Sequence, residues 1–178
     1  MTFTIALSEG ADGYAGTLDT FVDEARSDTM FGLGLSVLND TSSVQGGAQI
    51  GLVRFAVFAA AGGPVPDSAE ITAATLELNV SNTGQRLDIH DALFDWNEST
   101  TWSVSGRPMP DTHYASDPVS SIPDGMVGVT AHDVSASATR WQTEPNRGWV
   151  FVPSGGNSVI FDSSEGTMPP KLTLTYVD

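Results

Sequence analysis

The sequence predicts an all-β protein, an antiparallel β-sandwich of the jelly-roll type with one short helix. Apolar and polar residues alternate with a period of two through most of the chain, which is typical of strands that bury one face. Clusters of Gly, Pro, Asn, Asp and Ser interrupt these stretches at short intervals. Many short strands separated by such turns are typical of sandwiches and barrels.

Five stretches show the alternation most clearly. In chain order, their apolar positions are Phe3, Ile5 and Leu7; Val53, Phe55 and Val57; Leu76, Leu78 and Val80; Leu87 and Ile89; and Leu172, Leu174 and Tyr176. Arg54 lies between two of these positions, so we expect its side chain on the opposite face of the strand. There it would contact a partner or a glycan, or pair with an acid on a neighbouring strand, such as Glu77, and we favour the pairing.

One stretch has helical spacing. Between residues 133 and 141, Val134, Ala138 and Trp141 fall on one side of a helix. We expect this helix to cap one end of the sandwich. Because no linker or repeat interrupts the chain, the sequence predicts one domain spanning residues 1–178.

The composition excludes several classes of protein. The chain has 22 Asp and Glu against 7 Lys and Arg, a net charge of −15, so it lacks the basic cluster that nucleic-acid binding requires. It has no Cys, which excludes disulfides, thiolate catalysis and cysteine-ligated zinc. No apolar stretch is long enough to span a membrane, and the first residues do not read as a signal peptide.

No pattern of catalytic residues stands out. The chain has neither a GxSxG nucleophile elbow nor a dinucleotide fingerprint. Asp91 and Asp95 are a carboxylate pair of the kind that glycosidases use, but such pairs also arise by chance among 22 acids. The sequence therefore predicts no catalytic residue and no required cofactor.

Calcium is the ion that the acidic segments favour. Ca²⁺ binds carboxylate and carbonyl oxygens, and the segments 19–24 and 162–165 supply both. These segments meet if strands from the two ends of the chain are neighbours. The predicted ligands are Asp19, Asp23, Asp162 and Glu165.

Aromatic residues suggest a second kind of site. Exposed aromatic rings stack on sugar faces, whereas buried tryptophans fill the core. We interpret Trp96 and Trp141 as core residues. The candidate ligand-binding residues are Trp102, in a predicted loop, and Arg107, Tyr114, Arg147 and Trp149.

An ordered set of short segments runs through the whole chain. They are Asp12–Gly16, Asp19–Val22, Phe31–Gly32, Gly51–Phe55, Ile71–Leu76, Trp96–Trp102, Asp133–Val134, Trp141, Asn146–Gly148, Phe161–Glu165 and Pro170–Leu172. This set resembles the DNRLRE, or disaggregatase-related, domain family, which includes alginate-binding carbohydrate-binding modules. The resemblance implies a jelly-roll sandwich that is a non-catalytic accessory module in large secreted proteins.

Two functions are compatible with these features. The first is a surface decoration, or cement-like, subunit of a phage-like particle or related extracellular assembly, in contact with copies of itself or with neighbouring capsid subunits. The expected location is the virion surface or the extracellular space, where an acidic surface suits a salty medium. The alternative is a polysaccharide-binding module from a larger secreted marine bacterial protein. An enzyme such as a glycosidase or lyase is the third and weakest hypothesis.

Overall fold

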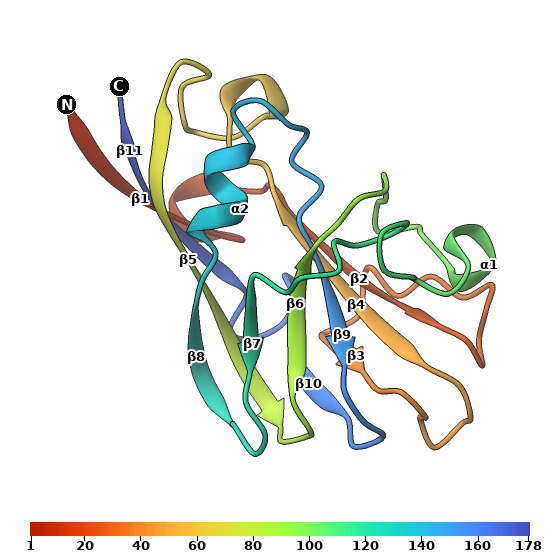
Figure 1. Ribbon diagram of the computed structural model, residues 1–178. Helices are drawn as coiled ribbons and strands as arrows, with labels where there is room; N and C mark the ends of the chain where they lie inside the picture. Colours follow the sequence, from red (N-terminus) through yellow and green to blue (C-terminus); the bar gives the residue numbers. More distant parts are fainter.

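The computed structural model describes all 178 residues and consists of two antiparallel β-sheets that pack face to face (Figure 1). The first sheet has six strands: β1 (Thr2–Ser8), β11 (Lys171–Val177), β5 (Glu70–Asn82), β10 (Val159–Asp162), β3 (Ser36–Asn39) and β8 (Gly128–Asp133). The second sheet has five: β2 (Thr17–Asp23), β4 (Gln49–Phe55), β9 (Trp149–Pro153), β6 (Leu87–Asp91) and β7 (Ser120–Ile122). The predicted antiparallel sandwich is confirmed.

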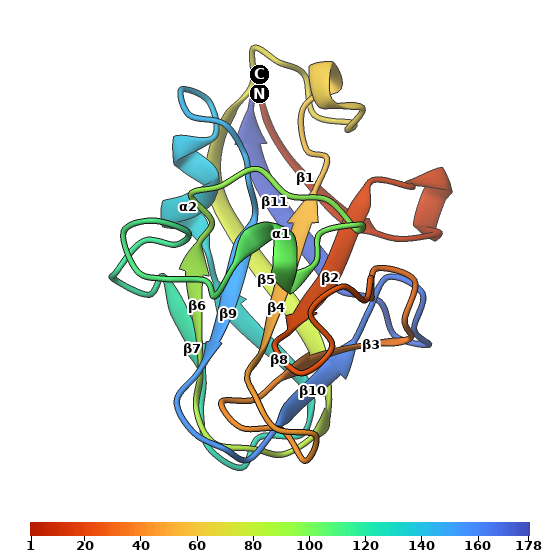
Figure 2. The same cartoon turned by 90° about the vertical axis from the view of Figure 1, so that its right-hand side faces the viewer.

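The chain wraps around the core as it does in a jelly roll. From β1 to β6, consecutive strands lie alternately in the first and the second sheet. The long strand β5 pairs with β11 along its first half, with β10 at its last residues and with β8 on its opposite edge. The N- and C-termini lie side by side at one end of the molecule (Figures 1 and 2).

The five predicted alternating stretches lie in β1, β4, β5, β6 and β11. Val57 is the exception, because it follows the last residue of β4 and is nevertheless fully buried. Most of the apolar side chains of these stretches contribute to the core between the sheets. The local period of two therefore identified both the strands and the faces that they bury.

The second sheet departs from the expected half-buried pattern, because its central strands are buried on both faces. A second apolar cluster covers its outer face, and we call this the outer cluster: Val22, Ile50, Leu52, Ala92, Trp96 and Val150. The segment 92–118 that follows β6 lies across this face and closes it (Figure 2). The alternation rule assumes that water covers the outer face, and a folded loop replaces the water here.

The short helices lie outside the sheets. The predicted helix is α2 (Ser135–Arg140), and Val134 and Ala138 bury its inner side in the core. Trp102 was expected in a loop, but it begins the single helical turn α1 (Trp102–Ser105). Two 3₁₀ turns, η1 (Ala11–Gly13) and η2 (Ala59–Ala61), complete the fold. None of these helices has the length and apolar character needed to cross a membrane.

Candidate functional site

The candidate site is a cleft of about 490 Å³ between helix α2 and the segment that follows β6. We call it the α2 cleft. Its floor contains Asp91, the last residue of β6, with Ala92 and Leu93 after it, and Gly148, directly before β9. One wall is the segment 115–119, and the other is formed by the end of α2 and the loop 144–147. A cleft of this size accommodates a small polar ligand or part of a chain of sugars.

The first wall is attached to β6 by backbone hydrogen bonds. The N–H of Ala115 donates to the carbonyl of Asp91 at 2.9 Å, and the N–H of Val119 donates to the carbonyl of Ile89 at 2.8 Å. Between these two attachments, the exposed Asp117 lines the cleft. The strand therefore holds the position of this wall, while the Asp117 carboxylate remains available to a ligand.

The opposite wall is held by the turn before β9. The side-chain amide of Asn146 donates to the carbonyl of Phe55 at 2.9 Å and accepts the N–H of Gly148 at 3.0 Å. Gly148 has a φ of +69°, and a Cβ there would lie 2.1 Å from a backbone oxygen of β4. The indole of Trp96 donates to the carbonyl of Arg147 at 2.8 Å. These contacts fix the backbone from which the Arg147 side chain projects.

Ion pairs position the charged groups of the cleft. The guanidinium of Arg140, at the end of α2, donates to the Asp91 carboxylate and lies 3.9 Å from Glu144. The guanidinium of Arg147 donates to Asp95 at 2.9 Å. The lining of the cleft thus contains two arginines and three carboxylates, those of Asp91, Asp117 and Glu144. Asp95 lies outside the lining. Each group retains donor or acceptor capacity, because a guanidinium has five N–H groups and a carboxylate about four lone-pair sites.

The structure separates the five predicted ligand-binding residues. Arg147 lines the α2 cleft, whereas Trp102 and Tyr114 are half-buried against the outer cluster. Arg107 is exposed near Tyr114; burial raises the pKa of the Tyr114 phenol and the Arg107 charge partly offsets this. The prediction for Trp149 is wrong, because this residue is fully buried between the sheets and its indole donates to Ser137. Trp149 and Phe151 are two residues apart on β9, so both side chains point to the core.

The four predicted calcium ligands do not form a metal site. Their two segments do meet, because the Asp19 carboxylate accepts the backbone N–H of Ser164 at 2.7 Å. However, one oxygen of the Asp162 carboxylate accepts hydrogen bonds from three other residues, and Asp23 lies in a separate network. No group of three His, Asp or Glu side chains is arranged to hold a metal ion. The residues present therefore do not fit the predicted calcium constellation.

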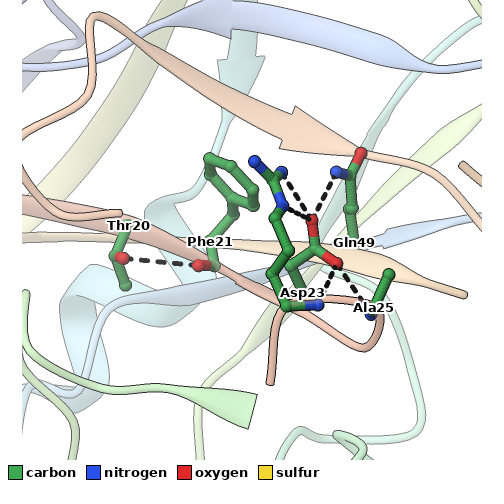
Figure 3. Close-up of polar contacts among 6 residues, drawn as sticks. Thr20, Phe21, Asp23, Ala25 and Gln49 are labelled. Carbon is green, nitrogen blue, oxygen red and sulfur yellow. Dashed lines mark hydrogen bonds and ion pairs between the residues drawn. The ribbon is translucent and has the colours of Figure 1, made fainter. Parts of the chain in front are cut away.

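Asp23 is a buried carboxylate with a complete set of partners. It accepts hydrogen bonds from the guanidinium of Arg26 at 2.6 and 3.0 Å and from the amide of Gln49 at 2.8 Å. The backbone N–H groups of Ala25 and Arg26 donate to its other oxygen (Figure 3). Burial raises the pKa of Asp23, but the hydrogen bond from Gln49 and the contacts with Arg26 outweigh it, so the net pKa is lowered.

Asp19 has the opposite electrostatic character, although it lies on the same face of β2. Its side chain is buried and accepts one hydrogen bond, from the backbone N–H of Ser164, which lowers its pKa only in part. Burial raises the pKa of Asp19 to about 7, and the negative charges of Glu165 and Glu98 add to the increase. The protein therefore contains a carboxylic acid that titrates near neutral pH.

The sequence analysis did not predict four charged residues of the cleft as ligand-binding residues: Asp91, Asp117, Arg140 and Glu144. Of these, it considered Asp91 only as a member of a carboxylate pair. One signal was available, because Arg140, near the end of the predicted helix, and Glu144, four residues later, have the spacing of an ion pair. The carboxylate pair considered for glycosidase chemistry is not a free pair, since each member binds an arginine of this site.

The expected pairing of Arg54 with Glu77 is also wrong. The two residues lie in different sheets, and Glu77 pairs with Lys171 at 2.5 Å. Arg54 instead faces the outer cluster, with its guanidinium carbon 5.4 Å from the centroid of the Trp96 ring. Burial lowers the pKa of Arg54, and the nearby Asp95 charge opposes this. Arg54 therefore helps to hold the loop that carries Trp96.

Comparison with known proteins adds no family to this description. No family model matches the chain, and no curated protein matches it. The class of protein is thus defined by the structure alone: it is an all-β sandwich with a charged cleft beside the short helix α2. The resemblance to the DNRLRE domain family stays a prediction.

Proposed function

We propose that the protein is a non-catalytic module that binds a neutral polysaccharide in the α2 cleft. The observation that carries this proposal is the arrangement of Arg140, Arg147, Asp91, Asp117 and Glu144 around one cleft with fixed walls. Sugars present neighbouring hydroxyl groups, each of which is both a donor and an acceptor. Guanidinium and carboxylate groups match such pairs with two parallel hydrogen bonds.

The charges of the cleft favour a neutral ligand over a polyanion. Three carboxylates and two guanidinium groups line it, and the guanidinium groups already bind Asp91 and Asp95. A uronate would meet guanidinium groups whose charge is already neutralised by these carboxylates, and it would approach a chain with a net charge of −15. A neutral sugar can insert hydroxyls beside the existing ion pairs without breaking them. Exposed Leu93, on the floor, offers an apolar contact to a sugar ring.

Replacement of Arg147 should weaken binding. We expect Arg147→Ala to lower the affinity for a neutral polysaccharide by about tenfold to a hundredfold, the usual effect of losing hydrogen bonds to a charged group. Isothermal titration calorimetry and affinity electrophoresis with a β-1,3-glucan, a mannan and a galactan measure this, with alginate as the polyanion for comparison.

A matched control is Arg86→Ala. Arg86 forms a similar exposed ion pair, with Asp88 at 2.7 Å, at the end of β6 that is remote from the cleft. This variant should bind like the unmodified protein. The proposal fails if the unmodified protein binds none of the neutral polysaccharides, if it binds alginate best, or if both variants lose affinity equally.

A second function is favoured by a different observation. The edge of strand β1 is long, uncharged and unpaired, which suits a subunit of a surface assembly such as a particle decoration. Immunogold electron microscopy of cultures of the source organism tests this function. Gold on regular particles would support a structural subunit, whereas gold confined to cell envelopes or secreted material would contradict it.

A further inference from the structure

Strand β1 forms one edge of the first sheet and pairs with β11 alone. Met1 and Asp178 extend this pairing and exchange two hydrogen bonds, at 2.6 and 3.2 Å. In an antiparallel ladder, hydrogen-bonded pairs alternate with pairs whose backbone groups point away. Phe3, Ile5 and Leu7 therefore bond to β11. The backbone groups of the intervening residues, Thr2, Thr4, Ala6 and Ser8, point to the open edge.

None of the devices that usually protect a sheet edge is present in β1. Residues 1–8 contain no charged side chain and no proline, and the pairing with β11 runs through seven residues without a bulge. The other edge strands differ. Strands β3 and β7 have only four and three residues, β2 carries two aspartates, and β8 ends in Asp133. The edge of β1 is the one that is long and uncharged.

An apolar groove and an exposed aromatic ring lie at opposite ends of this edge. The groove, of about 380 Å³, is bounded by residues 5–7 of β1 and by the turns 11–15 and 62–64. Asp12 is its only charged lining residue. At the other end, Phe3 stacks on Tyr176 at 5.4 Å and leaves 40% of its surface exposed. A two-fold axis through the middle of β1 would bring Phe3 of one copy to the groove of the other.

We propose that two copies of this chain pair through their β1 edges in an antiparallel, two-fold symmetric arrangement. In this register Thr2 lies opposite Ser8 of the second copy, and Thr4 lies opposite Ala6. Ile5 lies on the axis opposite Ile5 of the second copy. All four outward-pointing residues of each copy then bond to the other copy, and Phe3 lies next to Leu7 of the second copy, where it enters the groove.

The charge distribution favours a second copy over a different partner. Two chains of net charge −15 repel one another least where acidic side chains are absent, and residues 1–8 carry no acidic side chain. The edge is also self-complementary, since β1 carries the exposed ring and forms one side of the groove that receives it. The pairing does not depend on the ligand of the α2 cleft.

Cysteine cross-linking tests the register. In a pair without mutual hydrogen bonds, directly opposite Cα atoms are about 4.5 Å apart, which permits a disulfide. The chain has no native Cys, so Ile5→Cys should form a disulfide-linked dimer in oxidised glutathione. The matched control Phe3→Cys should not, because it lies opposite Leu7. Equal or absent cross-linking of the two variants would overturn the register.

Light scattering tests the dimer itself. We expect the unmodified protein to have roughly twice the monomer mass of 18.7 kDa at high micromolar concentration. Thr4→Pro removes an outward N–H that β11 does not use, so it should yield a folded monomer. Near-UV circular dichroism checks that this variant is folded. A monomeric unmodified protein, or a dimer that survives Thr4→Pro in a folded variant, would refute the pairing.

Discussion

Asp19→Asn should stabilise the protein at pH 8 and have a smaller effect at pH 5. The cause is the burial of Asp19, which raises the pKa of its carboxyl to about 7, with repulsion from Glu165 and Glu98. Above that pH, the folded state must hold a charge that water no longer solvates. Asparagine has no such charge, and its side-chain oxygen can still accept the N–H of Ser164.

The sign of the pH dependence follows from proton linkage. Between the usual aspartate pKa of 3.8 and about 7, Asp19 holds its proton more often in the folded state than in the unfolded state. Its contribution to the free energy of unfolding therefore falls as the pH rises through this window and stays low above it. Each unit of pKa shift corresponds to about 1.4 kcal/mol, so we expect a gain of a few kcal/mol at pH 8.

Urea denaturation of both proteins at pH 5 and pH 8 measures this effect. The free energy of unfolding of the variant is compared with that of the unmodified protein at each pH. The contributions of the other titrating acids are the same in both proteins and cancel in this difference. Asp28→Asn is the matched control, since it removes the charge of an exposed aspartate and should change stability little at either pH. If Asp19→Asn destabilises the protein at pH 8, Asp19 is stabilised there as a carboxylate and the interpretation is wrong.

Asp23→Asn should destabilise the protein by about 3 kcal/mol at pH 7, the scale of breaking a buried ion pair. An amide in this position would direct its NH₂ group at the donors of Arg26 and Gln49, which now donate to the Asp23 carboxylate (Figure 3). Gln49 is buried and would lose a partner, whereas the Arg26 guanidinium is partly exposed and can turn to water. Arg26→Ala should therefore cost less than Asp23→Asn.

The pH dependence of this second variant has the opposite sign. The pKa of Asp23 in the folded state is below its usual value of 3.8, so its contribution to stability is present above that value. The contribution is lost as the pH falls through the lowered pKa. The loss of stability caused by Asp23→Asn should consequently become smaller as the pH falls. Thermal unfolding of the variant and the unmodified protein between pH 7 and pH 3 measures this loss. A deficit that is constant over this range would show that the charge of Asp23 is not what stabilises the fold.

The strands were predictable because their signal is local. Apolar residues alternate with polar ones in β1, β5 and β11 whatever lies far away in the chain, and the same holds for the helical spacing that identified α2. The burial of Trp96 and Trp141 was predicted correctly from residue type, because a tryptophan side chain buries a large area in the core. Trp149 was misassigned as a ligand-binding residue although its phase with Phe151 already placed it on the core face.

The candidate site was only partly predictable, because its members come from distant segments. Arg147 was identified from the sequence, but its place beside Arg140 depends on how the 144–147 loop returns to α2. Arg54 was expected to meet Glu77, yet the alternation of strands between the two sheets separates them. Spacing along one strand shows which face a side chain occupies and does not show what covers that face.

Local period and composition were enough to predict the antiparallel β-strands, the short helix, the apolar faces of the core and the net negative charge. The electrostatics and the sites depend on which distant segments meet in the folded chain. Asp19 and Asp23 share one strand face, but Asp19 meets Ser164, 145 positions away, and Asp23 meets Gln49, 26 positions away. One carboxyl is buried among negative charges and the other beside a guanidinium, so their pKa values move in opposite directions.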